Sequence, residues 1–340
     1  GAEVMKKTMR AWVCREFTTP YHIKIEDMPV PEPGPGEVQI KVAAAGLNFG
    51  ETLVLKGTYQ KTPPLPYIPV SEFSGVVTAC GEGVTRLRVG DRVSTFSFEL
   101  AGGGLAEYAV ASETYVFKAP DQMGLIAAAV YPMNYWTAFN ALGSRGQLKA
   151  GEVLVVHGAT GGVGVAAIQI GKSMGATVIA TGNNAGRLSK LPAIGADHVI
   201  DLGAGDMRGQ IKALTDGRGA DVFFDPVGGE VFDESIRCIA PGGRLLVVGF
   251  TSGDFSTPRT NILLVKMIAV IGVEARLAIE QTNGRGRAEF NQMLEEFASG
   301  RLTPHVGQIY PFEQADKGYE DILNRRHFGK CVLKVNPELC

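Results

Sequence analysis

The chain has 340 residues, more than a single hydrophobic core usually organises, so we expect two domains. Apolar residues make up 45% and charged residues 20% of the sequence, which is typical of a globular protein. The net charge of −2 provides no basic surface for nucleic acid or for an anionic membrane, and we expect neither partner.

The sequence also bears on the compartment. No apolar run approaches the roughly 20 residues of a membrane span, and residues 1–9 lack the apolar core of a signal peptide. The five cysteines are odd in number, widely spaced and free of any C-x-x-C pair, which argues against a disulfide framework or a structural zinc site. We therefore expect a cytoplasmic protein with reduced thiols.

The predicted secondary structure changes in character along the chain. Up to about residue 130, short β-like runs alternate with Pro- and Gly-rich segments such as 29–36. From residue 131, helical patterns separate apolar strands, which we predict at 153–157, 177–181, 198–200, 221–225, 244–248 and 268–273. This alternation is typical of an α/β domain with a doubly wound parallel sheet.

The remainder, 274–340, carries a predicted helix at 288–299 and a last strand at 331–335. We expect it to return to the first domain. The predicted domains are therefore 1–130 together with 274–340, which is β-rich, and 131–273, which binds a dinucleotide.

A glycine turn follows the first strand of the second domain. Residues 153–164 read VLVVHGATGGVG, an apolar strand that leads through a glycine-rich turn into a helix. Glycines there permit a tight turn, close approach of the backbone to phosphate, and tight packing of the helix against the strand. Unpaired N–H groups at the helix start bind phosphates. We predict that Gly161, Gly162 and Val163 bind the pyrophosphate of a dinucleotide.

The segment after this turn lacks the acid that NAD-binding units use. An Asp or Glu about 20 residues further on usually binds the adenosine ribose, but none occurs within 153–196. The end of the second strand instead carries Asn183, Asn184 and Arg187, which suit a 2′-phosphate. We therefore predict NADPH rather than NADH. From composition alone, a solvated helix face explains Arg187 and Lys190 equally well.

Short motifs are spread over nearly the whole chain, at 33–38, 45–48, 57–59, 69–77, 89–93, 104–108, 158–164, 225–229 and 329–330. Together they resemble the medium-chain dehydrogenase/reductase superfamily, and within it the zinc-free, zeta-crystallin-like quinone oxidoreductase group. The resemblance implies a Rossmann sheet inserted into a β-rich GroES-like catalytic domain. It also implies a nicotinamide cofactor and a small-molecule substrate.

The resemblance also bears on metal binding. The alcohol dehydrogenases of this superfamily hold a catalytic zinc with two cysteines and a histidine, and the resemblance places Asn48, Ser71 and Met133 at those positions. An amide, a hydroxyl and a thioether are poor replacements for two thiolates and an imidazole. No metal is therefore expected.

The resemblance further implies site residues. Asn48 and Tyr59 would be catalytic: Asn48 would orient the cofactor or donate to the substrate carbonyl, and Tyr59 would donate its phenol proton or only line the pocket. Further cofactor contacts are implied at Thr137, Gly249, Phe250 and one of Arg325 and Arg326. The implied substrate pocket consists of Glu51, Phe96, Tyr131 and Tyr135. Ordinary core packing is an equally good interpretation of the aromatic residues, and an acid at a helix start is the simpler interpretation of Glu51.

These observations lead to one main hypothesis, an NADPH-dependent oxidoreductase that transfers hydride to a quinone or an α,β-unsaturated carbonyl. Such acceptors delocalise the resulting negative charge, so hydrogen-bond donors suffice without a metal. A CoA- or carrier-linked enoyl reductase, and an NADPH-binding structural or sensor protein, are the alternatives. We also expect a homodimer, because the apolar segments 261–265 and 268–273 lie at a predicted sheet edge.

Overall fold

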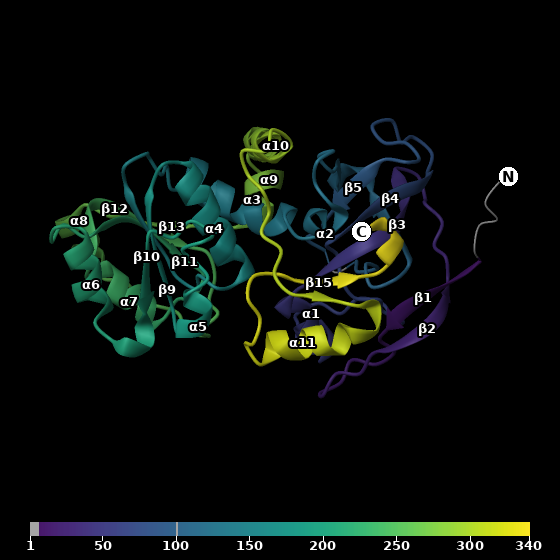
Figure 1. Cartoon of the computed structure of the whole chain (residues 1–340), viewed down its shortest axis with the longest axis horizontal. Helices are drawn as coiled ribbons and strands as arrows, with labels where there is room; N and C mark the ends of the chain where they lie inside the picture. The colour runs from purple at the N-terminus through teal and green to yellow at the C-terminus, as the bar shows by residue number, and fades with distance from the viewer. Residues whose placement is uncertain (1–6, 100) are drawn as a thin grey trace. The chain divides into compact units, whose positions relative to one another are not determined.

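The computed structural model describes residues 7–99 and 101–340; residues 1–6, part of the segment considered above for a signal peptide, lie outside it. The chain divides into two compact units (Figure 1). Unit 1 consists of Gly1–Met133 and Val306–Cys340, and unit 2 consists of Asn134–His305. In the described part, no helix has both the length and the apolar character needed to cross a membrane.

Unit 2 contains a six-stranded sheet in which every neighbouring pair is parallel. Its strand order is β10 (His198–Asp201), β9 (Thr177–Gly182), β8 (Val153–Val156), β11 (Ala220–Asp225), β12 (Ile239–Val247) and β13 (Ala269–Gly272). In chain order this is 3-2-1-4-5-6, the order of the dinucleotide-binding Rossmann sheet. The predicted doubly wound parallel sheet is confirmed.

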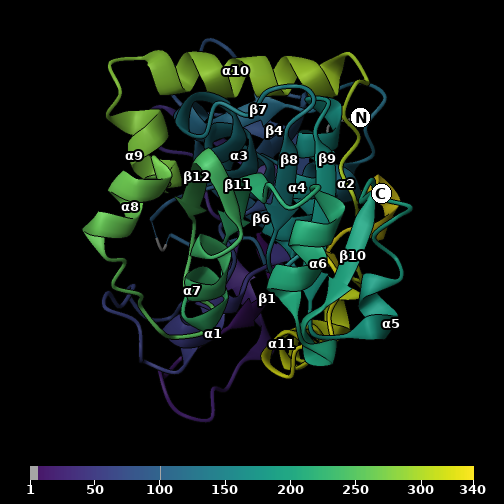
Figure 2. The same cartoon turned by 90° about the vertical axis from the view of Figure 1, so that its left-hand side faces the viewer.

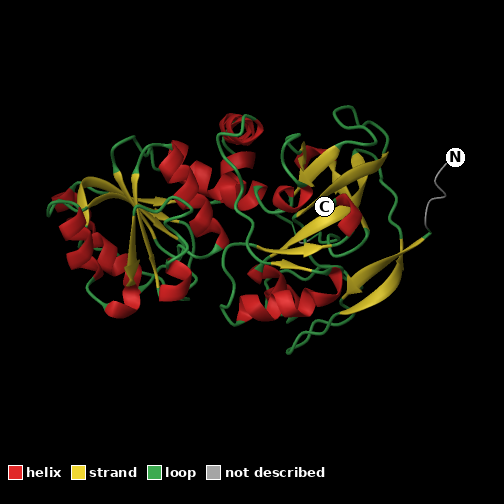
Figure 3. Ribbon diagram, viewed as in Figure 1, coloured by secondary structure: helices red, strands yellow, loops and turns green. Residues whose placement is uncertain are grey.

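Helices cover both faces of this sheet (Figure 3). Helix α4 (Gly162–Ser173) lies on one face, whereas α6 (Met207–Leu214) and α7 (Glu230–Ile236) cover the other, which faces the viewer in Figure 2. Buried apolar side chains fill the interior, among them Val155, Ile179, Phe223 and Leu245. Burial on both faces explains why these strands read as continuous apolar runs.

The segment 274–305 packs within unit 2, although the sequence suggested that it returns to the first domain. It carries α9 (Ala275–Glu280) and α10 (Arg285–Ala298). The indole N–H of Trp136, on α3 (Pro132–Asn140), donates to the Ala275 carbonyl at 2.9 Å, and Asn140 Nδ2 donates to Glu289 Oε1 at 2.7 Å. These long-range hydrogen bonds hold both helices to α3. The remaining α-helices of unit 2 are α5 (Ala185–Leu188) and α8 (Thr260–Lys266).

Unit 1 is rich in β-structure, as predicted. Its main sheet runs β14 (Ile309–Tyr310), β15 (Cys331–Lys334), β3 (Glu37–Leu47), β4 (Phe73–Cys80), β5 (Arg92–Thr95) and β7 (Val116–Lys118), and β6 (Tyr108–Ser112) also pairs with β3. A separate hairpin joins β1 (Thr8–Val13) to β2 (Lys24–Pro29). The antiparallel pairing of β15 with β3 brings the end of the chain beside its first third.

Three helices accompany this sheet: α1 (Phe49–Leu55), α2 (Leu125–Ala128) and α11 (Ala315–Leu323). Helix α1 begins two residues after β3 ends at Leu47, and α11 lies beside it (Figure 1). The Tyr319 hydroxyl on α11 donates to Glu51 Oε1 on α1 at 2.8 Å. This arrangement fixes Asn48 at the junction between strand and helix.

Candidate active site

The glycine turn of unit 2 has the geometry of an anion site. Gly161 caps α4 in an extended conformation and provides no side-chain cap for the first turn. Gly158 adopts a φ of +57°, which favours glycine. A Cβ atom at Gly164 would lie 2.3 Å from the Gly158 carbonyl oxygen, so only glycine fits there. The open N–H groups at the start of α4 suit the pyrophosphate of a dinucleotide.

A buried histidine, His157, holds the end of β8 in place. Its Nδ1 lies 2.7 Å from Thr181 Oγ1 and its Nε2 lies 2.7 Å from Ser235 Oγ. Because the Ser235 hydroxyl already donates to the Val231 carbonyl at 2.6 Å, it must accept from Nε2–H, and Nδ1 must accept from Thr181. Burial lowers the pKa of His157 to about 3, so the ring is neutral. This histidine is a structural group.

The predicted 2′-phosphate residues follow β9. Asn183 is exposed and Arg187, on α5, is half-buried. The side chain of Asn184 caps helix α5, because its Oδ1 accepts from the Arg187 backbone N–H at 2.9 Å. On the neighbouring strand Asp201 lies opposite Gly182, and its carboxylate accepts from the Gly203 N–H at 2.9 Å.

Unit 1 contains a cavity of about 270 Å³ at the junction of β3 and α1. Aromatic side chains form part of its lining, namely Tyr67, Phe96 and Phe98; its polar lining includes Asn48, Glu51, Ser71 and Glu72. Phe96 is buried and packs edge-on against Phe98, with ring centroids 5.3 Å apart. The predicted pocket residues Glu51 and Phe96 therefore lie together with the predicted catalytic residue Asn48.

Asn48 and Glu51 are tied together at the start of α1. Glu51 Oε1 accepts from the Asn48 backbone N–H at 2.9 Å, and Glu51 Oε2 accepts from Asn48 Nδ2 at 3.4 Å. Burial raises the pKa of Glu51 to about 7, although the hydrogen bonds and the nearby Lys330 charge oppose this shift. The sequence suggested a helix-start acid, and the structure adds that this acid is buried and has a raised pKa.

A buried ion pair completes the polar part of the cavity. Lys330 Nζ lies 2.9 Å from Glu72 Oε1, and both side chains are less than a tenth exposed. Lys330 also donates to Asn48 Oδ1, and the Met133 backbone N–H donates to Glu72 Oε2 at 3.2 Å. Glu72 and Lys330 lie in the motifs at 69–77 and 329–330, but the sequence alone assigned them no role. The signal that could have identified them is a charged residue within a mostly uncharged stretch of sequence in each motif.

The other predicted site residues of unit 1 lie outside the described lining of this cavity. Tyr59 follows α1 and is 42% exposed. Tyr131 is buried, and burial raises the pKa of its phenol. Arg325 and Arg326 follow α11 and are exposed, and Arg326 pairs with Glu320 at 3.4 Å.

The predicted residues of unit 2 divide between interior and surface. Tyr135 is buried, and its hydroxyl accepts from the His305 backbone N–H at 2.8 Å. Thr137 is half-buried on α3. Gly249 and Phe250 follow β12, and Phe250 is 47% exposed and packs against Phe255. Gly161, Gly162 and Val163 form the start of α4 as predicted.

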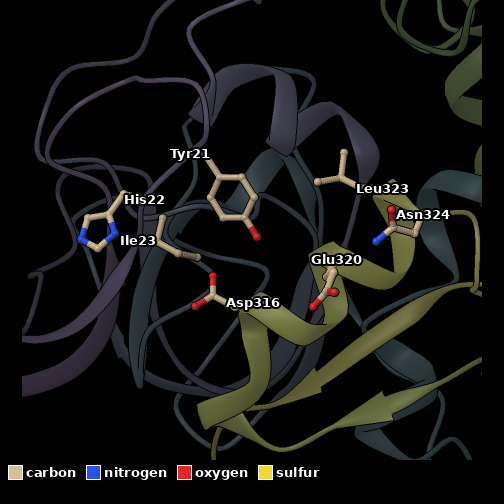
Figure 4. Close-up of a pocket in the computed structure, with 7 residues that line it drawn as sticks. All are labelled: Tyr21, His22, Ile23, Asp316, Glu320, Leu323 and Asn324. Carbon is tan, nitrogen blue, oxygen red and sulfur yellow. The ribbon is translucent and has the colours of Figure 1, made fainter.

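A second cavity in unit 1, of about 410 Å³, is lined by Tyr21, His22, Ile23, Asp316, Glu320, Leu323 and Asn324 (Figure 4). The Tyr21 hydroxyl points between the carboxylates of Asp316 and Glu320. Burial and the Asp316 charge raise the pKa of Tyr21. Two carboxylates repel phosphate, so this cavity is unsuited to the anionic part of a dinucleotide.

The donor groups of the described residues offer little for metal binding. Across residues 7–99 and 101–340, no three His, Cys, Asp or Glu side chains are grouped so that they could hold a metal ion. At two of the three positions considered above, Asn48 Oδ1 accepts from the Lys330 ammonium group and Ser71 Oγ accepts from the Gly102 N–H at 2.9 Å. Both oxygen atoms therefore already accept a hydrogen bond from the protein.

Comparison with known proteins gave matches along the chain. Residues 34–121 match the family described as alcohol dehydrogenase GroES-like domain, and residues 162–299 match the family described as zinc-binding dehydrogenase. Over 333 residues the chain is 32% identical to quinone oxidoreductase-like protein 2 homolog from Nematostella vectensis, covering 97% of this chain and 90% of that protein.

Solved structures agree with this. A quinone oxidoreductase from Pseudomonas syringae pv. Tomato superimposes with a TM-score of 0.82 and 30% identity, covering 96% of this chain and 99% of the other. A structure titled NAD-dependent alcohol dehydrogenase superimposes with a TM-score of 0.87 and 32% identity, covering 96% of this chain and 100% of the other.

Proposed function

Because the chain belongs to the medium-chain dehydrogenase/reductase superfamily, in its quinone oxidoreductase-like group, we propose that it reduces a quinone or an α,β-unsaturated carbonyl with NADPH and without zinc. Membership makes the protein an oxidoreductase that uses a nicotinamide cofactor and a small-molecule substrate. The choice of cofactor, the acceptor and the independence from zinc are the parts that we propose.

The observation that carries the proposal is the contact of Lys330 with Asn48. An ammonium group bonded to Asn48 Oδ1 would stand beside any divalent cation placed at that residue, and like charges repel strongly in a buried site. The remaining donors, a serine hydroxyl and a methionine thioether, are not the thiolate and imidazole ligands that zinc prefers. An acceptor whose reduction needs no Lewis acid fits this cavity.

The lining of the cavity supports the choice of acceptor. Phe96 and Phe98 supply an apolar aromatic wall, and the Asn48 amide supplies a hydrogen-bond donor within the same cavity. A bound nicotinamide would supply the hydride, a hydrogen with its electron pair, to the acceptor carbon. The negative charge then develops on the acceptor oxygen, where an Asn48 N–H donor would stabilise it. Water would supply the proton that completes the reduction.

The preference for NADPH is supported by the end of β9. No acid stands between residues 153 and 196, the Asp201 carboxylate opposite Gly182 caps its own turn, and Arg187 lies next to the strand end. A guanidinium matches phosphate oxygens and has no matching partner on an unphosphorylated ribose.

The activity is tested by steady-state assays with 1,4-naphthoquinone, cyclohex-2-enone and trans-2-hexenal, each with NADPH and with NADH. We expect NADPH oxidation with at least one acceptor, unchanged by a zinc chelator, and a higher kcat/KM with NADPH than with NADH. Tight NADPH binding without turnover of any acceptor would instead identify a structural or sensor protein. Turnover of a simple alcohol that a chelator abolishes would refute the zinc-free proposal.

The cofactor preference is tested with Arg187→Glu. The substitution removes a charge-assisted contact of about 1.5–3 kcal/mol, so NADPH affinity should fall while NADH affinity changes little. Arg237→Glu is the matched control, because it makes the same charge change on an exposed residue at the opposite, amino-terminal end of β12. Equal NADPH affinity in Arg187→Glu and the parent would refute this role of Arg187.

We further propose a homodimer formed through β13. This strand pairs with β12 on one side and is the last strand of its sheet, and α8 beside it leaves Leu264, Val265 and Met267 at least three-quarters exposed. Unpaired strand edges and apolar patches of this kind favour association. Light scattering at micromolar concentration should give the mass of a dimer for the parent and a lower mass for Val265→Glu; a monomeric parent would contradict the proposal. A cytoplasmic location stays a prediction from the sequence.

A further inference from the structure

The Lys330–Glu72 pair is unusual among the described ion pairs of unit 1 because both of its side chains are buried. The Lys330 side chain is 7% exposed and the Glu72 side chain 4%, whereas the Lys41–Glu338 pair is 31% and 56% exposed. Removing two charges from water is costly, and apolar residues of similar volume are often equally stabilising. Its burial within the cavity therefore suggests a role beyond stability.

The hydrogen bond from Lys330 fixes which way the side-chain amide of Asn48 is turned. An asparagine side chain has one acceptor oxygen and one donor nitrogen, and Lys330 Nζ occupies the oxygen. If the amide turned over, Nδ2 would face the ammonium group, donor against donor. The ammonium group therefore fixes the orientation in which Oδ1 faces Lys330 and Nδ2 points away from it.

The Nδ2 group of Asn48 makes only a weak contact with an acceptor among the described residues. Among the described residues, Nδ2 contacts one acceptor, Glu51 Oε2, at the long distance of 3.4 Å. An NH₂ group carries two hydrogens, and Asn48 lines the cavity. At least one N–H of Asn48 thus remains for a ligand oxygen.

The backbone around the pair is shaped to hold it. Glu72 Oε2 accepts from the Met133 N–H at 3.2 Å, which fixes the carboxylate. A Cβ atom at Gly46 would lie 3.0 Å from Lys330 Cε and 3.1 Å from Glu72 Oε1, so glycine leaves the space through which the lysine reaches Asn48. The pairing of Cys331 with Leu47 sets the neighbouring residues Lys330 and Asn48 at the same end of the sheet.

We propose that Lys330, held by Glu72, is a positioning residue that presents the Asn48 amide N–H to the carbonyl oxygen of the hydride acceptor. This inference rests on the proposed function. Lys330 lies behind Asn48 and acts through it, and its positive charge draws electron density from the amide oxygen, which makes the N–H a stronger donor. The donor is needed most when the acceptor oxygen gains negative charge during hydride addition.

The test uses the full chain and the double variant Lys330→Met with Glu72→Gln, which removes both charges and leaves no unpaired buried ion. Asn48→Ala, and the triple variant that combines all three changes, complete a double-mutant cycle. The matched control is Lys41→Met with Glu338→Gln, which neutralises an exposed Lys–Glu pair of the same unit. Each protein is assayed for kcat and KM with the acceptor that the parent turns over, for NADPH affinity, and for chemical unfolding.

We expect the Lys330→Met/Glu72→Gln variant to lose about tenfold in kcat, with NADPH affinity unchanged. This loss is smaller than the about 100- to 1000-fold known for removal of an oxyanion donor, because the Asn48 amide itself remains. In the Asn48→Ala background, the same two changes should have almost no further effect, because the group through which Lys330 acts is gone. A merely structural pair would lower kcat by the same factor in both backgrounds. The Lys41→Met/Glu338→Gln control should match the parent.

The outcomes separate the two levels of the proposal. Full kcat in the Lys330→Met/Glu72→Gln variant, or additive losses in the cycle, would overturn the positioning role while leaving the proposed function intact. A parent chain that turns over no acceptor would overturn the proposed function, and the role of Lys330 would fall with it.

Discussion

The clearest quantitative prediction concerns Glu51, which is buried beside Asn48. Burial raises its pKa from the ordinary value of 4.5 to about 7 in the folded chain, so between these values the folded state binds a proton that the unfolded state has lost. The free energy of unfolding therefore falls as the pH rises through this window. At about 1.4 kcal/mol for each pKa unit, the loss is about 3 kcal/mol.

The perturbation is Glu51→Gln. Its amide oxygen can still accept from the Asn48 backbone N–H and from the Tyr319 hydroxyl, but its side chain cannot ionise. Relative to the parent, the variant should therefore gain about 3 kcal/mol in unfolding free energy between about pH 4 and about pH 8.

Urea unfolding of both proteins at several pH values measures this difference. Glu82→Gln, at an exposed position of the same unit, is the control and should show no pH-dependent difference from the parent. If the unfolding free energies of Glu51→Gln and the parent changed in parallel over this range, the burial argument for Glu51 would be refuted.

Three further predictions concern unit 2. Because burial lowers the pKa of His157 to about 3, the unfolded state binds the extra proton first, so the parent should lose stability as the pH falls below about 6.5, and His157→Gln should lose less over the same range in urea unfolding. Gly164→Ala would place a Cβ atom 2.3 Å from the Gly158 carbonyl oxygen, so calorimetry should show weaker binding of NADPH and urea unfolding should show a destabilisation of about 1–3 kcal/mol. The control Gly186→Ala, whose Cβ atom would meet ordinary contacts, should change the unfolding free energy little. Arg244 donates to both carboxylate oxygens of Glu152 and to the Gly146 and Gln147 carbonyls, so Arg244→Met should lower the unfolding free energy by about 2 kcal/mol. NADPH affinity should stay unchanged, because these contacts lie at the amino-terminal ends of the strands. An unchanged unfolding free energy would show that these hydrogen bonds contribute little.

Local sequence was informative wherever structure depends on neighbours in the chain. The strands of unit 2 were predictable because β8, β9 and β11 are buried on both faces and the residues at their centres are apolar. The glycine turn was predictable because the steric demands at Gly158 and Gly164 can be met by few other residues. The missing acid after this turn could be read directly.

The polar interior of unit 1 was not predictable in the same way. Lys330 meets Asn48 across 282 positions of the chain, and Tyr319 meets Glu51 across 268. The helix-start interpretation of Glu51 gave its place correctly. Its raised pKa, however, depends on burial against α11, which no local pattern records. The segment 274–305 likewise joins unit 2 through hydrogen bonds to α3 more than a hundred positions away.

The sequence by itself thus determined the order of the elements, the parallel sheet and the glycine turn, because each of these follows from periodicity, apolar runs and backbone sterics over a few residues. Only the tertiary structure decided which charged and polar groups meet in the cavity of unit 1. Ion pairing, burial and amide orientation depend on distances between side chains from remote segments, and here the pairing of β15 with β3 sets those distances.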